Sequence, residues 1–228
     1  MSRLRVLLTT TVLGLALALP ASAAFAAKPA SAVKAGSSSK SVTKGSARVE
    51  FATFSMGCFW CGETQFEQQP GVKSVVSGYT GGTEENPTYE QVSAGATGHY
   101  ESIQVAFDPT VTSYEKMLDL FWHGIDPTQG DGQFCDHGHQ YRSAIFGHNA
   151  RQLRLAEESR KAIEASGVLH DPIVTEIRPA GAFWPAEEYH QDFWKKDPER
   201  YRSYRLGCGR DARLKELWGD KAVVPLVH

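Results

Sequence analysis

No apolar run in this 228-residue sequence reaches the length of about 20 residues that a membrane-spanning helix needs. The N-terminal apolar run, Val6 to Leu19, is too short for a comfortable span; arginines precede it and small residues follow it. That order is typical of a secretory signal peptide. We therefore predict a signal peptide over residues 1–26, with an uncleaved N-terminal anchor as the alternative. No cysteine, and so no lipid-anchor signal, lies near the two candidate cleavage sites, Ala21-Ser22-Ala23 and Ala24-Phe25-Ala26.

The sequence also lacks a dense basic stripe beyond its N-terminal segments. Its 24 Lys and Arg and 26 Asp and Glu give a formal net charge of −2, so nucleic-acid binding has no electrostatic footprint. Residues 27–47 have almost no large apolar side chain, which predicts a flexible linker. Residues 48–228 suit one domain with a single core and show no internal repeat. We expect a periplasmic or secreted protein without stable membrane association.

Cysteine is scarce, and there is no second C-x-x-C. In an exported protein the first interpretation is two structural bridges with three possible pairings. A domain of this size does not need them, and a bridge between Cys58 and Cys61 would close too small a loop to gain much entropy. A zinc site would need two further ligands. The residues that these alternatives involve are Cys58, Cys61, Cys135 and Cys208, with His137 and His139 as further zinc ligands.

The hydrophobic patterns predict an α/β domain. Val49–Phe54 and Val72–Tyr79 are expected strands, and the helix between them, Cys58–Gln68, makes a βαβ unit with parallel pairing and a right-handed crossover. Further strands are expected at 101–107, 141–146 and 173–177, and further helices after the capping residues Thr112 and Asn149. Loops or short helices are expected after Pro179. The fold class predicted is a two-layer α/β sandwich with a mixed sheet and a ferredoxin-like core.

Cys58 lies where a strand turns into a helix. Free backbone N–H groups and the helix dipole favour negative charge there, which predicts a lowered pKa for the Cys58 thiol. Cys61 follows on the same helical face. Phe59 and Trp60 between them could wall a pocket for a small apolar group, although core packing is the simpler interpretation of an aromatic pair. This placement indicates a nucleophilic or redox cysteine.

Glu101 begins the strand in which Ile103, Val105 and Phe107 share one face. A carboxyl in that row is expected to be partly desolvated, so that its pKa rises and it can donate a proton near neutrality. The alternative is an exposed glutamate at a strand end. A thiolate with such an acid suits a substrate whose oxygen must leave as hydroxide or water.

These segments resemble the A-type peptide methionine sulfoxide reductases over about residues 50 to 192. Gly57-Cys58-Phe59-Trp60 is similar to the family's nucleophile motif. Other family segments follow in the expected order, and such linked motifs are specific: Asn86-Pro87-Thr88-Tyr89, Thr97-Gly98-His99-Tyr100-Glu101, Asp126-Pro127-Thr128-Gln129, Gln140-Tyr141-Arg142-Ser143-Ala144-Ile145 and Glu187-Glu188-Tyr189-His190-Gln191.

The resemblance implies a role for each matching residue. Cys58 would attack the sulfoxide sulfur, while Phe59 and Trp60 would hold the methyl group of the substrate. The polar groups implied around the sulfoxide oxygen are Glu101 as proton donor, Tyr89 and Tyr141 as hydrogen-bond donors, and Asp136 as the residue that orders the site and its water. The family acts on the S epimer of methionine sulfoxide and uses no metal or organic cofactor. Its fold is an α/β two-layer sandwich.

The sequence departs from the common family pattern at its other cysteines. Cys61 stands where that pattern has Gly, Cys135 where many members have Asn, and Cys208 in place of a glycine-rich tail. After attack by Cys58, a second thiol is expected to convert the resulting sulfenic acid to a disulfide. Cys208 is favoured over Cys61, because the family generally resolves with a C-terminal cysteine; Cys135 is a buried packing residue or a relay. A periplasmic thioredoxin-like protein is the expected reductant.

Two other functions compete with this one. A general thiol–disulfide oxidoreductase using Cys58 and Cys61 fits the C-x-x-C after a strand, but it gives Glu101 and the tyrosines no role. A non-enzymatic zinc-binding module is the second alternative.

Overall fold

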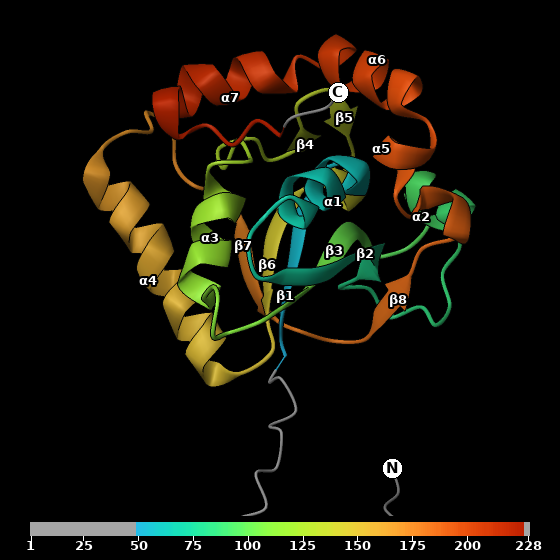
Figure 1. Ribbon diagram of the computed structural model, residues 1–228, viewed down its shortest axis with the longest axis horizontal. Coiled ribbons are helices and arrows are strands. Elements are labelled where there is room, and N and C mark those ends of the chain that lie inside the picture. The colour runs from blue at the N-terminus through green and yellow to red at the C-terminus, as the bar shows by residue number, and fades with distance from the viewer. Residues whose placement is uncertain (1–48, 226–228) are drawn as a thin grey trace, which may run out of the picture. The chain divides into compact units, whose positions relative to one another are not determined.

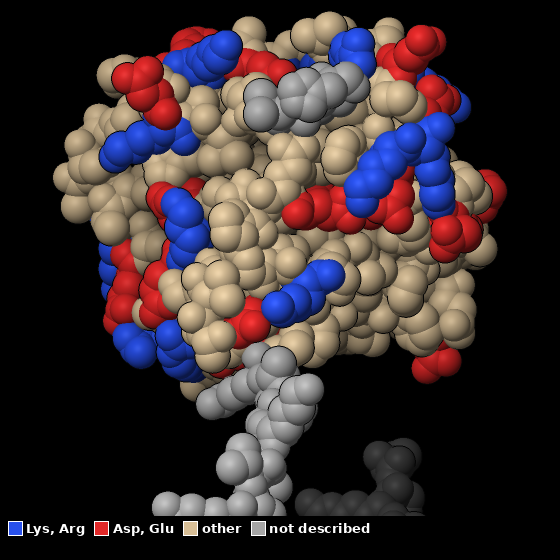
Figure 2. Space-filling model, viewed as in Figure 1, with Lys and Arg blue, Asp and Glu red and all other residues tan. Residues whose placement is uncertain are grey.

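The computed structural model describes residues 49–225. The predicted signal peptide, 1–26, and linker, 27–47, lie outside the described residues. Within 49–225, no helix combines the length and apolar character needed to cross a membrane. On the face of the molecule seen in Figure 2, acidic and basic side chains are interspersed, without a field of one sign.

A six-stranded sheet with the order β7-β6-β1-β3-β2-β8 forms the centre of the described part. Its strands are β1 (Glu50–Met56), β2 (Val72–Thr80), β3 (Tyr100–Phe107), β6 (Ser143–Gly147), β7 (Glu176–Pro179) and β8 (Phe183–Pro185). A separate two-stranded ribbon consists of β4 (Gly132–Gln133) and β5 (Asp136–His137). Within residues 49–225, only β6 and β7 pair in parallel; the other neighbours in the sheet are antiparallel. The predicted mixed sheet is confirmed.

Helices cover the sheet and one end of it (Figure 1). Packed near the central strands are α1 (Phe59–Glu67), α3 (Tyr114–Trp122) and α4 (Ala150–Ser166), while α6 (Pro198–Gly207) and α7 (Arg210–Trp218) run across the end where α1 begins. The shorter elements are α2 (Tyr89–Ser93), α5 (Phe193–Lys196), η1 (His139–Tyr141), η2 (Glu188–His190) and η3 (Gly219–Lys221). The α/β sandwich predicted from the hydrophobic patterns is confirmed.

The predicted parallel pairing of the first two strands is wrong. Strands β1 and β2 point the same way, but β3 lies between them and is antiparallel to both. This is a split βαβ arrangement. Periodicity along the chain identifies strands, but it does not say which later strand will enter between two earlier ones. Strand β3 is buried on both faces, as a central strand should be.

Strand register places Glu101 at the helix-covered face of the sheet. Phe54 pairs with Ile103, so β1 ends at Met56 beside Glu101, and Tyr79 of β2 pairs with Glu101 on the other side. The ring of Phe54 stacks on Phe66 and other aromatic side chains at centroid distances of 5.0 to 6.4 Å. A close-packed core of this kind resists displacement, so the junction between β1 and α1 is firmly supported.

Local boundaries differ slightly from the sequence expectations. Helix α3 is capped by Ser113, whose hydroxyl accepts from the Lys116 backbone N–H at 3.2 Å, and not by Thr112. Strand β7 begins at Glu176, later than expected. The C-terminal region contains two regular helices, α6 and α7, in which two arginine side chains are buried.

Candidate active site

The turn from β1 into α1 requires a glycine. Gly57 has φ of +78°, and a Cβ added there would come within 2.6 Å of the Gln133 Cβ. A side chain at this position would therefore meet both backbone strain and a packed neighbour. Cys58 follows as the N-cap of α1, and its carbonyl accepts from the Cys61 backbone N–H at 3.1 Å.

Two carboxyl groups lie at the start of α1. Glu101 Oε2 accepts from the Phe59 N–H at 3.1 Å. The negative charge of Asp136 acts on the Cys58 thiol, and Asp136 Oδ2 accepts from the Tyr204 hydroxyl. The Phe59 N–H is therefore already bonded to a carboxyl oxygen, and the Cys58 side chain makes no capping hydrogen bond.

Glu101 is set up to carry a proton at neutral pH. Its side chain is only 2% exposed. Burial raises the pKa of Glu101 to about 8, and the negative charges of Asp136 and Cys61 add to the effect, against the Phe59 N–H bond. The desolvation expected from the strand pattern is present, and at neutral pH the carboxyl is a proton donor.

Cys58 and Cys61 are both free thiols and both buried, with exposures of 6% and 1%. Burial, the hydrogen bond to Cys61 and nearby negative charges raise the pKa of Cys58 well above its ordinary value. The pKa of Cys61 is lowered to about 6, because Cys58 donates a hydrogen bond to it and because two guanidinium groups, Arg210 and Arg205, lie nearby. The directions of the two shifts favour the proton on Cys58 and the negative charge on Cys61.

The predicted lowering of the Cys58 pKa is thus wrong. The expectation depended on open N–H groups at the helix start, but the Glu101 carboxyl already accepts from the Phe59 N–H. Desolvation and the negative charges of Glu101 and Asp136 then dominate.

Aromatic rings enclose the cysteine pair on one side. The Trp60 indole stacks on Phe193 at 3.8 Å between centroids, and its Nε1–H donates to His190 Nδ1 at 3.2 Å. Phe59 is fully buried and contacts the His190 ring at 4.9 Å. Phe59 therefore packs in the core, whereas Trp60, which stacks on Phe193, is only partly buried.

The two tyrosines implied by the resemblance lie in the same site, although their segments are far apart in sequence. Tyr89 begins α2 and Tyr141 ends η1, and both are half-buried. Burial and then the charge of Glu101 raise the pKa of both phenols, that of Tyr89 to about 12. Their hydroxyl groups therefore stay protonated and can donate hydrogen bonds near Glu101.

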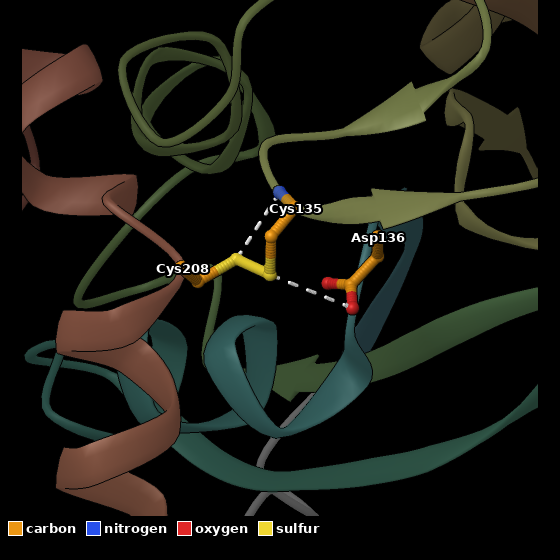
Figure 3. A group of neighbouring side chains, drawn as sticks. All are labelled: Cys135, Asp136 and Cys208. Carbon is orange, nitrogen blue, oxygen red and sulfur yellow. Dashed lines mark hydrogen bonds between the residues drawn. A yellow bond between two sulfur atoms is a disulfide. The ribbon is translucent and has the colours of Figure 1, made fainter.

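Cys135 and Cys208 form a disulfide, with their Cα atoms 5.0 Å apart. It joins the β4–β5 ribbon to the end of α6, next to Asp136 (Figure 3). Cys135 is exposed, which contradicts its assignment as a buried packing residue. In this state Cys208 is bonded to Cys135, and Cys61 is the thiol that contacts Cys58.

The donors considered for a zinc site are engaged elsewhere. The Cys135 sulfur is bonded to Cys208. His137 Nδ1 lies 2.9 Å from Asp131, and His139 Nε2 lies 2.6 Å from the Thr97 carbonyl. The set does not converge on Cys58 and Cys61, so the residues present do not fit that metal centre.

Sequence reasoning missed several residues of this site: Tyr204, Arg205, Arg210, His190 and Gln133. The two arginines belong to helices rich in charge, where the usual expectation is a solvated face. His190 lies in the late family segment and carried a usable signal there. For the arginines, only burial in the folded protein distinguishes them from surface charges.

A buried thiol pair facing a protonated carboxyl and two phenol hydroxyls defines a thiol-dependent oxidoreductase that can protonate a substrate oxygen. Residues 50–222 match the family model described as peptide methionine sulfoxide reductase. The chain is similar to peptide methionine sulfoxide reductase MsrA of Bacillus licheniformis, at 57% identity over 75% of this chain and 95% of that protein. Its identity to the Bacillus subtilis MsrA is 53%, over 77% of this chain and 99% of that protein.

Among solved structures, methionine sulfoxide reductase A of Corynebacterium diphtheriae is similar at 33% identity. The TM-score is 0.60, over 68% of this chain and 77% of that chain. The chain belongs to the peptide methionine sulfoxide reductases, as an A-type member. It is an oxidoreductase that reduces methionine sulfoxide.

Proposed function

We propose that this protein reduces methionine-S-sulfoxide, free or in proteins, through nucleophilic attack by Cys58, in repair of oxidative damage. The observation that carries this proposal is the protonated Glu101 beside the Cys58 thiol at the start of α1. Trp60 offers an apolar surface for the substrate's methyl group, and Tyr89 and Tyr141 offer hydroxyl donors for its oxygen.

The chemical steps follow from these groups. The Cys58 thiol loses its proton to the neighbouring Cys61 sulfur as the Cys58 sulfur bonds to the sulfoxide sulfur, while Glu101 gives its own proton to the sulfoxide oxygen. Breakdown of this adduct releases methionine and leaves the oxygen on Cys58 as a sulfenic acid. Asp136, held by the Tyr204 hydroxyl, orders the site beside the start of α1 during the reaction.

Cys61 resolves the sulfenic acid in this proposal. The sulfenic acid and the Cys61 thiol condense to a Cys58–Cys61 disulfide, and water leaves. Contact between the two sulfurs supports Cys61, since the alternative, Cys208, would first have to be released from Cys135. A thioredoxin-like dithiol then returns both cysteines to thiols.

A stereospecific assay tests the substrate assignment. The assay uses each sulfoxide epimer with a chemical dithiol as reductant. We expect the S epimer to be reduced at least about 10²-fold faster than the R epimer, because the R epimer loses proton donation to its oxygen. The stereogenic sulfur must present its oxygen to Glu101 and its methyl group to Trp60 together, and one epimer does so. Turnover of insulin disulfides without turnover of either sulfoxide would support a general thiol–disulfide oxidoreductase instead.

The proposal includes export. Residues 1–26 are proposed as a cleaved signal, which places the mature protein and its reductant in the periplasm or outside the cell. Mass spectrometry of the protein from the exported fraction should find an N-terminus after Ala23 or Ala26. A mature protein that keeps residues 1–26 would overturn this part of the proposal.

A further inference from the structure

Two buried polar side chains of α6, Tyr201 and Arg205, lie beside the cysteine pair. Arg205 Nη1 donates to the Tyr201 hydroxyl at 3.3 Å. Tyr201 packs with Cys61 in one buried cluster, where its hydroxyl helps to lower the pKa of the Cys61 thiol. Tyr201 and Arg205 are 0% and 3% exposed. Arg205 is held on its other side by Asp211, at 2.6 Å. Charged side chains are rarely so buried without a partner or a task.

A second guanidinium approaches from α7. Arg210 is almost fully buried, and its Nη2 donates to the carbonyls of Met56 and Gly124 at 3.0 and 2.9 Å. These bonds fix the arginine beneath the turn that carries Cys58. Its Nε, like the Nε of Arg205, has no hydrogen-bond partner. Two positive charges from separate helices are thus fixed close to Cys61.

The groups that face Cys61 divide by charge. Positive charge comes from Arg205 and Arg210, and the Tyr201 hydroxyl and the Cys58 thiol also lower the pKa of Cys61. Three titratable groups would disfavour the Cys61 thiolate if they were ionised: Glu101, Tyr204 and Tyr201. Glu101 is protonated at neutral pH, and the pKa values of both tyrosines are raised. At pH 7 the surroundings of Cys61 therefore favour its thiolate, and the Cys58 thiol donates its proton toward it.

We propose that Tyr201 and Arg205 act as positioning residues that hold Cys61 as the acceptor of the Cys58 thiol proton during attack on the sulfoxide. The Cys58 sulfur–hydrogen bond breaks as the Cys58 bond to the substrate sulfur forms, and the proton goes to Cys61. Glu101 supplies the second proton, to the sulfoxide oxygen. The thiol that Cys61 has then become attacks the sulfenic acid, and its proton leaves in the water that is released.

This inference rests on the proposed function, and it predicts a pH dependence. The first turnover requires Cys61 ionised and Glu101 protonated, so its rate should rise through about pH 6 and fall through about pH 8. Removing the Tyr201 hydroxyl should affect only the lower limb of the profile, which is the rise in rate on the acid side. That rise should move to higher pH by about one unit, because the hydroxyl no longer stabilises the charged Cys61 sulfur.

The experiment measures methionine formed in the first turnover, from pH 5 to 9, for Tyr201→Phe. We expect a loss of about tenfold at pH 6 that largely disappears at pH 8. Arg205→Gln should shift the limb in the same direction, and Arg205→Lys should restore most of it. The matched control is Tyr114→Phe, which removes another buried hydroxyl, one without a partner, from α3; its lower limb should stay in place.

A rate that is unchanged, or reduced equally at every pH, in both Tyr201→Phe and Arg205→Gln would overturn the inference. Either variant can test the inference if the other does not fold, and circular dichroism shows whether each variant is folded. Cys58→Ser separates this inference from the proposed function. If Cys58→Ser still forms methionine, the proposed function fails; if it is inactive while the limb does not move, only the inference fails.

Discussion

Cys58→Ser is expected to reduce methionine sulfoxide reduction by at least about 10⁴-fold, measured as methionine formed in a single turnover. A serine hydroxyl is a far weaker nucleophile toward sulfur, and it cannot form the sulfenic acid or the disulfide. Cys58 is the N-cap of α1 but makes no capping hydrogen bond with its side chain, so the change should cost little stability.

The matched control replaces the other cysteine pair. A Cys135→Ser/Cys208→Ser double variant also loses sulfur, but at the surface disulfide between the β4–β5 ribbon and α6. Its first turnover should stay within about tenfold of the native rate, because the Tyr204–Asp136 hydrogen bond still joins these segments. If Cys58→Ser keeps a rate similar to that of this control, the nucleophile has been assigned to the wrong residue.

Glu101→Gln is expected to slow the first turnover by about 10² to 10⁴-fold at pH 7, the usual contribution of a general acid. The native carboxyl carries a proton below its pKa of about 8 and loses it as the pH rises, so the native rate should fall through that range. Gln has no proton to give, so the residual rate should not show that fall.

Glu63→Gln is the matched control for this change. Glu63 is another fully buried glutamate, on α1, and burial raises its pKa to about 7. Its carboxyl contacts the Asp192 backbone N–H, away from Cys58. The variant should keep the fall in rate near pH 8. Should Glu63→Gln remove that fall while Glu101→Gln retains it, Glu101 would not be the proton donor.

Local patterns predicted much of the structure that supports the site. The alternation of Ile103, Val105 and Phe107 placed Glu101 on the core side of its strand, and the strand-to-helix turn placed Cys58 at a helix start. Both features depend on residues close in sequence. The antiparallel insertion of β3 between β1 and β2 could not be predicted in the same way, because strand order depends on contacts between distant segments.

The charge state of the cysteine pair could not be predicted from its motif. The helix start alone favours a Cys58 thiolate. In the folded protein Glu101 accepts from the Phe59 N–H, the charge of Asp136 acts on Cys58, and Arg205 and Arg210 arrive from the C-terminal helices. These long-range contacts favour the negative charge on Cys61. Likewise, the sequence allowed three pairings of four cysteines, and only the fold brings Cys135 to Cys208.

The location of the transferred oxygen tests the central claim most directly. Cys61→Ser protein should be mixed with one equivalent of methionine-S-sulfoxide and a reagent that labels sulfenic acids, and the labelled peptide then identified by mass spectrometry. The account predicts one label on Cys58 for each methionine formed. Methionine formed with the label on another cysteine, or with no labelled cysteine, would contradict it.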